Sequence, residues 1–239
     1  MRDGLTRVAS APAVLAGAIA VLWWLEGSWD RRITIAGFLL WAFLSGGILD
    51  RYARARPTRA RGFFGACGAH VLAMVRLGLV VVLAHAVLHA TLGSRADNAY
   101  VMAVALVLLL IVSAIGVYGQ IRLVVEDRRS AAGSLIAGAR FVRRHPSAGA
   151  MFVVYALIIW GWVAAMAAIA PAADDGGVAV LHTALRLTGL AFAGLALHAS
   201  GVALFQARLA HAGYTAGPPQ EWPESPAAEA IANASHAAP

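Results

Sequence analysis

The chain has 239 residues, of which 60% are hydrophobic and 13% are charged, and its mean hydropathy is +0.72. A soluble domain usually carries about 25% charged residues, so this composition excludes an ordinary soluble domain. The formal net charge is +7, and all 19 basic residues are arginine. A positive balance can indicate a nucleic-acid partner, but these arginines lie between long apolar runs, so we expect a membrane protein and no nucleic-acid partner.

The apolar runs predict an all-α, multi-pass transmembrane bundle. A run of about 18 or more apolar residues can cross a hydrocarbon core of about 30 Å as a helix. The runs are continuous, whereas the strands of a membrane barrel alternate. We expect about six spans, at residues 8–25, 33–49, 69–91, 99–125, 148–170 and 178–205, with a helical lead-in to the third from Phe63.

Both ends of the chain differ in character from the spans. Arg2 and Arg7 precede the first apolar run, as in a signal peptide, but the run continues into Trp23 and Trp24 without a small-residue cleavage site. We therefore expect an uncleaved first span and a transmembrane domain over residues 1–212. Residues 213–239 are rich in proline and lack an apolar period, which predicts a disordered tail.

The distribution of arginine predicts that both termini are cytoplasmic. Basic residues concentrate in the connection 50–61 and in the connection that follows the fourth span, whereas the loop around Asp174 and Asp175 contains none. Cytoplasmic loops of membrane proteins carry an excess of arginine and lysine. Arg31 and Arg32 in the first loop argue weakly against this orientation. The arginine usage and the alanine richness are typical of a GC-rich bacterial genome, so we expect a location in the bacterial inner membrane.

Residues 128–145 form a separate basic element. On a helical wheel, Arg129, Arg140, Arg143 and Arg144 share one side, and Ala131, Leu135 and Val142 lie opposite. This pattern predicts a short amphipathic helix at the membrane interface, with its arginines toward anionic lipid headgroups. An ordinary, partly helical basic loop is the alternative, because Gly133 and Gly138 lower the helix propensity.

Arg76 is the most informative charged residue, because it lies inside the third apolar run. An arginine at the centre of a span costs about 2.5–3.5 kcal/mol on insertion scales. Arg76 therefore either snorkels to the cytoplasmic headgroups, pairs with a carboxylate, or serves a ligand. Its candidate companions at the cytoplasmic ends of the spans are Asp50, Arg122, Glu126 and Asp127. These charges mark either the membrane boundary or a polar vestibule for an anionic or zwitterionic ligand.

Three histidines are weak candidates for a metal site. His85 and His89 are one helical turn apart, and His182 is expected on the same side of the membrane. Two ligands from one helix are too few, and neither an HExxH motif nor a set of histidine boxes is present. Packing or hydrogen-bonding roles are the simpler interpretation, and we expect no cofactor.

No motif in the sequence specifies a catalytic activity. It contains no phosphate-binding loop, nucleophile elbow or dinucleotide-binding glycine pattern. The leading hypothesis is a non-enzymatic inner-membrane protein, either a transporter-like bundle or a membrane subunit of a larger complex with protein partners. The alternatives are a membrane-embedded enzyme that acts on lipid and a structural scaffold.

Overall fold

The computed structural model is entirely helical over the residues that it describes, which are 2–9, 11–12, 14–15, 18–19, 31–54, 59–92, 98–170 and 176–209. The helices that have defined bounds are α1 (Arg2–Ala9), α3 (Arg31–Arg54), α4 (Ala60–Leu92), α5 (Ala99–Val125), α6 (Ala131–Arg144), α7 (Pro146–Ala168) and α8 (Gly176–Arg208). The predicted all-α class is confirmed for this part of the chain.

Four of these helices, α4, α5, α7 and α8, are long and apolar enough to cross a membrane. They correspond to the predicted third, fourth, fifth and sixth spans. The expected lead-in to the third span is helical, because α4 begins at Ala60. The predicted second span lies within α3, which is not among the four, and the first span and the tail fall largely or wholly outside the described residues. The six-span count therefore stays a prediction.

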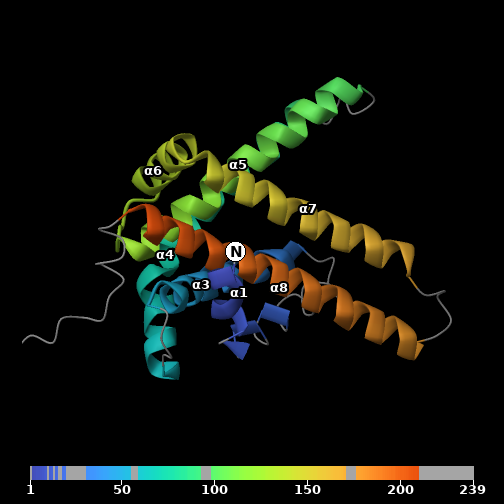
Figure 1. The fold of residues 1–239 in the computed structure, drawn as a ribbon, viewed down its shortest axis with the longest axis horizontal. Coiled ribbons are helices and arrows are strands. Elements are labelled where there is room, and N and C mark those ends of the chain that lie inside the picture. The colour runs from blue at the N-terminus through green and yellow to red at the C-terminus, as the bar shows by residue number, and fades with distance from the viewer. Residues whose placement is uncertain are drawn as a thin grey trace, which may run out of the picture.

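The long helices form two antiparallel hairpins, α4–α5 and α7–α8 (Figure 1). α3 packs along α4, and α1 packs along α8. The hairpins meet at the end where α3, α5 and α8 finish and α4 and α7 begin, which we call the arginine-rich end. In Figure 1 they diverge from there, since the start of α5 extends to the upper right and the far ends of α7 and α8 extend to the right and lower right.

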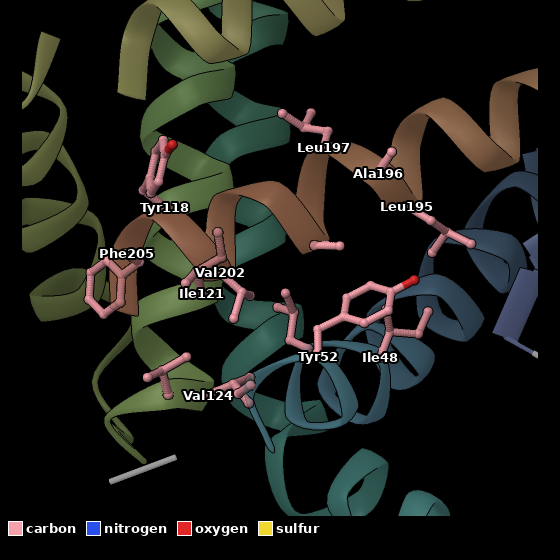
Figure 2. Close-up of a cluster of buried hydrophobic side chains, with 14 of the residues drawn as sticks. Ile48, Tyr52, Tyr118, Ile121, Val124, Leu195, Ala196, Leu197, Val202 and Phe205 are labelled. Atoms are coloured by element: carbon pink, nitrogen blue, oxygen red, sulfur yellow. The ribbon is translucent and has the colours of Figure 1, made fainter. Parts of the chain in front are cut away.

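The core lies near the arginine-rich end and centres on the second half of α8. Leu195, Val202 and Phe205 are fully buried there, against Ile121 of α5 and Tyr52 of α3 (Figure 2). In the most apolar stretch of α8, 61% of the residues are buried, compared with 11% in α4 and 17% in α5 and in α7. α8 is thus the central helix, and the other three candidate spans expose most of their apolar surface.

Glycines allow the helices to approach closely at several contacts. A Cβ on Gly138 of α6 would lie 2.8 Å from the backbone nitrogen of Gly119 and from the carbonyl oxygen of Ile115, both in α5. A Cβ on Gly201 of α8 would lie 2.7 Å from Cδ1 of Ile121. Small residues that let backbones approach are typical of helix interfaces in membranes.

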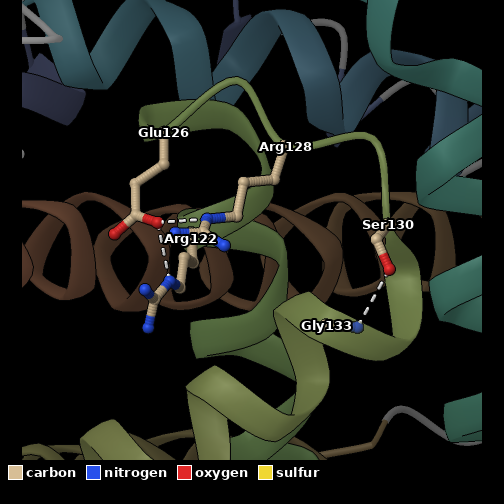
Figure 3. A network of polar contacts seen from close by, with 5 residues as sticks. All are labelled: Arg122, Glu126, Arg128, Ser130 and Gly133. Carbon is tan, nitrogen blue, oxygen red and sulfur yellow. Dashed lines mark hydrogen bonds and ion pairs between the residues drawn. The ribbon is translucent and has the colours of Figure 1, made fainter.

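The basic element between α5 and α7 is a helix, α6, so the helical interpretation is confirmed over the loop. Its first turn is capped by Ser130, whose Oγ accepts a hydrogen bond of 3.1 Å from the Gly133 backbone (Figure 3). The buried face consists of Ser134, Ala137, Gly138 and Phe141 and packs on α5, whereas the predicted apolar residues Ala131, Leu135 and Val142 lie at its edges and are half-buried. The sequence pattern gives weight to large apolar side chains, whereas the small residues serine and glycine form part of the buried face. This explains why the predicted and observed faces differ. A location at the membrane interface stays a prediction.

The Gly138 contact generates a test of how α6 is held. We expect Gly138→Leu to lower the melting temperature of the purified protein in detergent, because the new side chain would meet α5 backbone that cannot move aside. The expected loss is about 1–3 kcal/mol, the usual range for overpacking. Gly161→Leu in α7 is the matched control, since no described atom lies within 4 Å of its Cβ position. Equal melting temperatures for the two variants would contradict the close α5–α6 contact.

Candidate functional site

Glu126 lies at the centre of an ion cluster at the arginine-rich end. Its Oε2 accepts hydrogen bonds from Nε of Arg122 at 2.7 Å and from Nε of Arg128 at 2.6 Å (Figure 3). The Glu126 side chain is 5% exposed, so it is a nearly buried carboxylate with two cationic partners. Two of the five predicted site residues, Arg122 and Glu126, are thus brought together, and they bind each other.

The geometry of this cluster follows from the way α5 ends. The Arg128 backbone N–H donates to the Leu123 carbonyl at 2.9 Å, and that of Asp127 donates to the Val124 carbonyl at 3.3 Å. These two bonds are the Schellman pattern that terminates a helix, with the residue after the cap in the left-handed region. Asp127 holds that position with a φ of 47°. The turn reverses the chain and directs Arg128 back to Glu126.

A second polar group gathers around His70 of α4. Asp50 and Arg54 of α3 form an ion pair of 2.8 Å, and both act electrostatically on the His70 imidazole together with Asp127. The predicted residues Asp50 and Asp127 thus both act on the same imidazole. The sequence interpretation missed His70 and Arg54, although the spacing of four residues between Asp50 and Arg54 was a visible signal.

α1 contributes an arginine that the sequence interpretation also missed. Nη1 of Arg7 donates to the backbone carbonyl of Tyr52 and, at 3.2 Å, to Oε1 of Gln206 in α8. Gln206 in turn donates to the Ala53 carbonyl at 2.9 Å. The last carbonyls of a helix have no partner within the helix, so these two side chains cap α3. The same contacts join α1, α3 and α8.

Not every buried polar group is satisfied. The hydroxyls of Tyr52, Tyr118 and Ser134 are buried without a hydrogen-bond partner in the described part of the chain. Burial raises the pKa of Tyr52, against a smaller opposing effect from Arg51, so the phenol stays protonated. An unpaired buried hydroxyl costs about 1–3 kcal/mol. Within the described part of the chain, these three hydroxyls therefore lower the stability of the core.

Arg76 is exposed on α4, and no ion pair joins it to a described carboxylate. The adjacent Leu77 lies beside Gly119 of α5, with its Cδ1 3.3 Å from the Cβ position of that glycine. From Arg76 to Leu92, the last residue of α4, the helix rises about 24 Å at about 1.5 Å per residue. The hydrocarbon core is about 30 Å thick, so this depth is compatible with snorkelling to the headgroups.

The arginines of α6 lie at a similar level along the bundle. Gly138 is beside Gly119, and the ring of Phe141 is 4.9 Å from the ring of Tyr118, so the intervening Arg140 is level with Arg76. Arg129, Arg140, Arg143 and Arg144 are all exposed. Exposed arginines therefore lie on the outside of both α4 and α6.

Two of the three candidate metal ligands, His85 and His182, make hydrogen bonds to other groups. Nδ1 of His85 lies 2.8 Å from the Val81 carbonyl, and its Nε2 lies 2.9 Å from Oγ of Ser113. Nε2 of His182 lies 2.8 Å from the Met166 carbonyl. His89 is exposed. Among the described residues, no group of three or more histidine, cysteine, aspartate or glutamate side chains is arranged to hold a metal ion.

Comparison with known proteins finds no matching family, no matching curated protein and no matching solved structure. The geometry is therefore the basis for any functional proposal. At the arginine-rich end, Asp50 and Glu126 are paired with arginines of the same chain, and the exposed arginines face outward.

The contrast between Glu126 and Arg76 can be tested by thermal unfolding in detergent. Glu126→Gln removes the charge that two arginines share, so we expect a loss of about 1–3 kcal/mol. Arg76→Leu removes an exposed charge without a described partner, so we expect a change within about 0.5 kcal/mol or a gain. If Arg76→Leu destabilised the protein as much as Glu126→Gln, the snorkelling interpretation would be wrong and a structural partner would exist.

Proposed function

We propose that the chain is a multi-pass subunit of a larger assembly in a bacterial inner membrane, with both termini in the cytoplasm. The observation that carries this proposal is an exposed face of small residues on α4. Gly62, Gly65, Ala69 and Leu72 lie within one side of the helix, and all are exposed. No described atom lies within 4 Å of the Cβ positions of Gly62, Gly65 or the adjacent Gly68.

These glycines need an explanation, because each costs about 1 kcal/mol of helix stability relative to alanine. Gly47 and Gly138 lie at close helix contacts, where a Cβ would clash. Gly161 and Gly194 also have open space, but the α4 face differs from these in that it gathers three such glycines within about two turns. On the exposed face of α4 the space is empty. A helix of a partner, either a second copy of the chain or another subunit, would occupy it and compensate the cost.

The polar groups favour an assembly role over solute transport. A transport path needs polar side chains that are available to a solute along the spans. In α5 and α7 the stretches that lie away from the arginine-rich end are largely apolar. Ser113 of α5 binds His85, and together with His89 these side chains line a single pocket rather than a path through the bundle. At the arginine-rich end, Glu126 and Asp50 are engaged by arginines of the same chain.

The exposed arginines support the orientation and the choice of lipid partner. Arg76 and the α6 arginines 140, 143 and 144 would lie at the cytoplasmic headgroups of an N-in, C-in protein, where anionic lipids neutralise them. Each basic residue near such a surface contributes about 1 kcal/mol. This contact anchors the subunit and sets the depth of the bundle.

The proposed orientation predicts the results of reporter fusions. Fusions after Arg61, Arg144 and Arg208 should report a cytoplasmic location, because arginine-rich connections are retained inside. Fusions after Arg95 and Asp175 should report the periplasm. A periplasmic signal after Arg144 would overturn the orientation and the six-span path.

The assembly is tested by cysteine cross-linking in native membranes. Gly65→Cys should give an adduct larger than the single chain, because the α4 face is expected to contact a partner helix. An adduct of twice the mass identifies a second copy, and any other mass identifies a different subunit. Gly161→Cys is the control, since Gly161 also has open space but lies on α7, away from the small-residue face.

Two further comparisons complete the cross-linking experiment. The parent protein gives the background, because its single cysteine, Cys67, is buried. Gly65→Leu should abolish co-purification of the partner while it leaves the melting temperature of the isolated chain unchanged, since its side chain meets no described atom. If Gly65→Cys stays at the mass of one chain under all conditions, the proposed assembly role is wrong.

A further inference from the structure

A pocket of about 620 Å³ lies between α4 and α5, on the side of the bundle away from the arginine-rich end. Trp160 of α7 also lines it. Pockets that bind small molecules measure about 300–1,000 Å³, so this one has the volume of a ligand site. Its walls are mostly leucine side chains of α4 and α5, together with Met102 and Ala105.

Three polar side chains, His85, His89 and Ser113, line the same pocket. A carbonyl oxygen can only accept a hydrogen bond, so the Val81 carbonyl fixes the proton of His85 on Nδ1. Nε2 of the neutral imidazole is then an acceptor, and the Ser113 hydroxyl donates to it across 2.9 Å. The remaining lone pairs of Ser113 Oγ can accept a hydrogen bond from a ligand.

His89 supplies the complementary group. It lies one helical turn from His85 on α4, is exposed, and makes no hydrogen bond to a described residue. Its imidazole N–H can donate, and Ser113 Oγ can accept. A hydroxyl group both donates and accepts, so it matches this pair of positions.

The charge of the pocket decides between classes of lipid. None of the residues that line it carries a formal charge when the histidines are neutral. A phosphate buried there would lose its hydration without gaining a counter-ion, which is costly. A neutral headgroup meets no such penalty.

We infer that this pocket binds a neutral, hydroxyl-bearing lipid from the bilayer, with an acyl chain along the leucines and its hydroxyl between Ser113 and His89. This site is independent of the proposed assembly, since it uses the α4–α5 face next to α7 and not the small-residue face of α4. The lipid enters laterally, because the surrounding surface of α4 and α5 is exposed and apolar.

The test is photo-cross-linking of the full-length protein in phosphatidylcholine nanodiscs. The probe is a diacylglycerol that carries a diazirine in one acyl chain. We expect saturable labelling of peptides from α4, α5 and the Trp160 region, and competition by unlabelled diacylglycerol. A phosphatidylglycerol with the same chains should compete at least tenfold less well.

Matched variants connect the labelling to the pocket. Leu106→Trp fills it, and Leu108→Trp places the same side chain on a neighbouring exposed position of α5 that does not line it. Leu106→Trp should remove saturable labelling, and Leu108→Trp should retain it. Both residues are partly exposed, so neither change disturbs the core. Ser113→Ala should weaken binding about three- to tenfold through the lost hydrogen bond.

Three results would overturn the inference. Equal labelling of Leu106→Trp and the parent protein would mean annular lipid only, without a built site. Equal competition by phosphatidylglycerol would show that the pocket does not select a neutral headgroup. A parent protein with no saturable labelling contradicts the site itself, whereas the cross-linking of Gly65→Cys is unaffected by any of these outcomes.

Discussion

The close approach of helix backbones at the arginine-rich end is the constraint on which the rest of the structure depends. α6 can lie on α5 because Gly138 faces Gly119 without an intervening side chain, and α8 can reach Ile121 because position 201 is glycine. Such a close approach brings many atoms of neighbouring helices into van der Waals contact, which stabilises the interface. The contacts concentrate where α3, α5, α6 and α8 meet, and this explains why 61% of the apolar stretch of α8 is buried and so little of the other candidate spans.

Several helices meet at the arginine-rich end, and this also explains how the charged groups there are stabilised. Arg7 and Gln206 can cap α3 only because α1, α3 and α8 meet there. Glu126 is nearly buried, yet it receives two arginines from the turn that ends α5. A buried charge is stabilised when its partners are fixed in place, so the Schellman turn and the ion cluster form one structural unit. Arg76 is the exception, because it is exposed and forms no ion pair with a described carboxylate.

Features that depend on the local sequence, such as the bounds of a helix, could be predicted. Features that depend on which helices pack against each other could not. The residues 99–125 form a continuous apolar run, and α5 has those bounds. Asp50 and Asp127 were expected at one end, because span direction alternates along the chain. His70 was missed because its proximity to Asp127 depends on the α4–α5 register, which no local pattern specifies. Arg7 binds a residue 45 positions away and another 199 positions away. Its location before the first apolar run indicated only how that run relates to the membrane. Ser113 and His85 likewise become a pair only in the folded hairpin.

The divergence of the hairpins follows from the same constraint, because their described contacts concentrate at the arginine-rich end. It is tested most directly by electron-spin distance measurements in nanodiscs on doubly labelled full-length protein, whose native Cys67 is buried and does not react. One pair of labels, at Arg129 and Ala207, reports the arginine-rich end, and a second pair, at Tyr100 and Leu181, reports the opposite ends of α5 and α8. All four positions are exposed. The account predicts a longer mean distance for the second pair than for the first. Equal distances would show that the hairpins run parallel, and would contradict a bundle held together at one end.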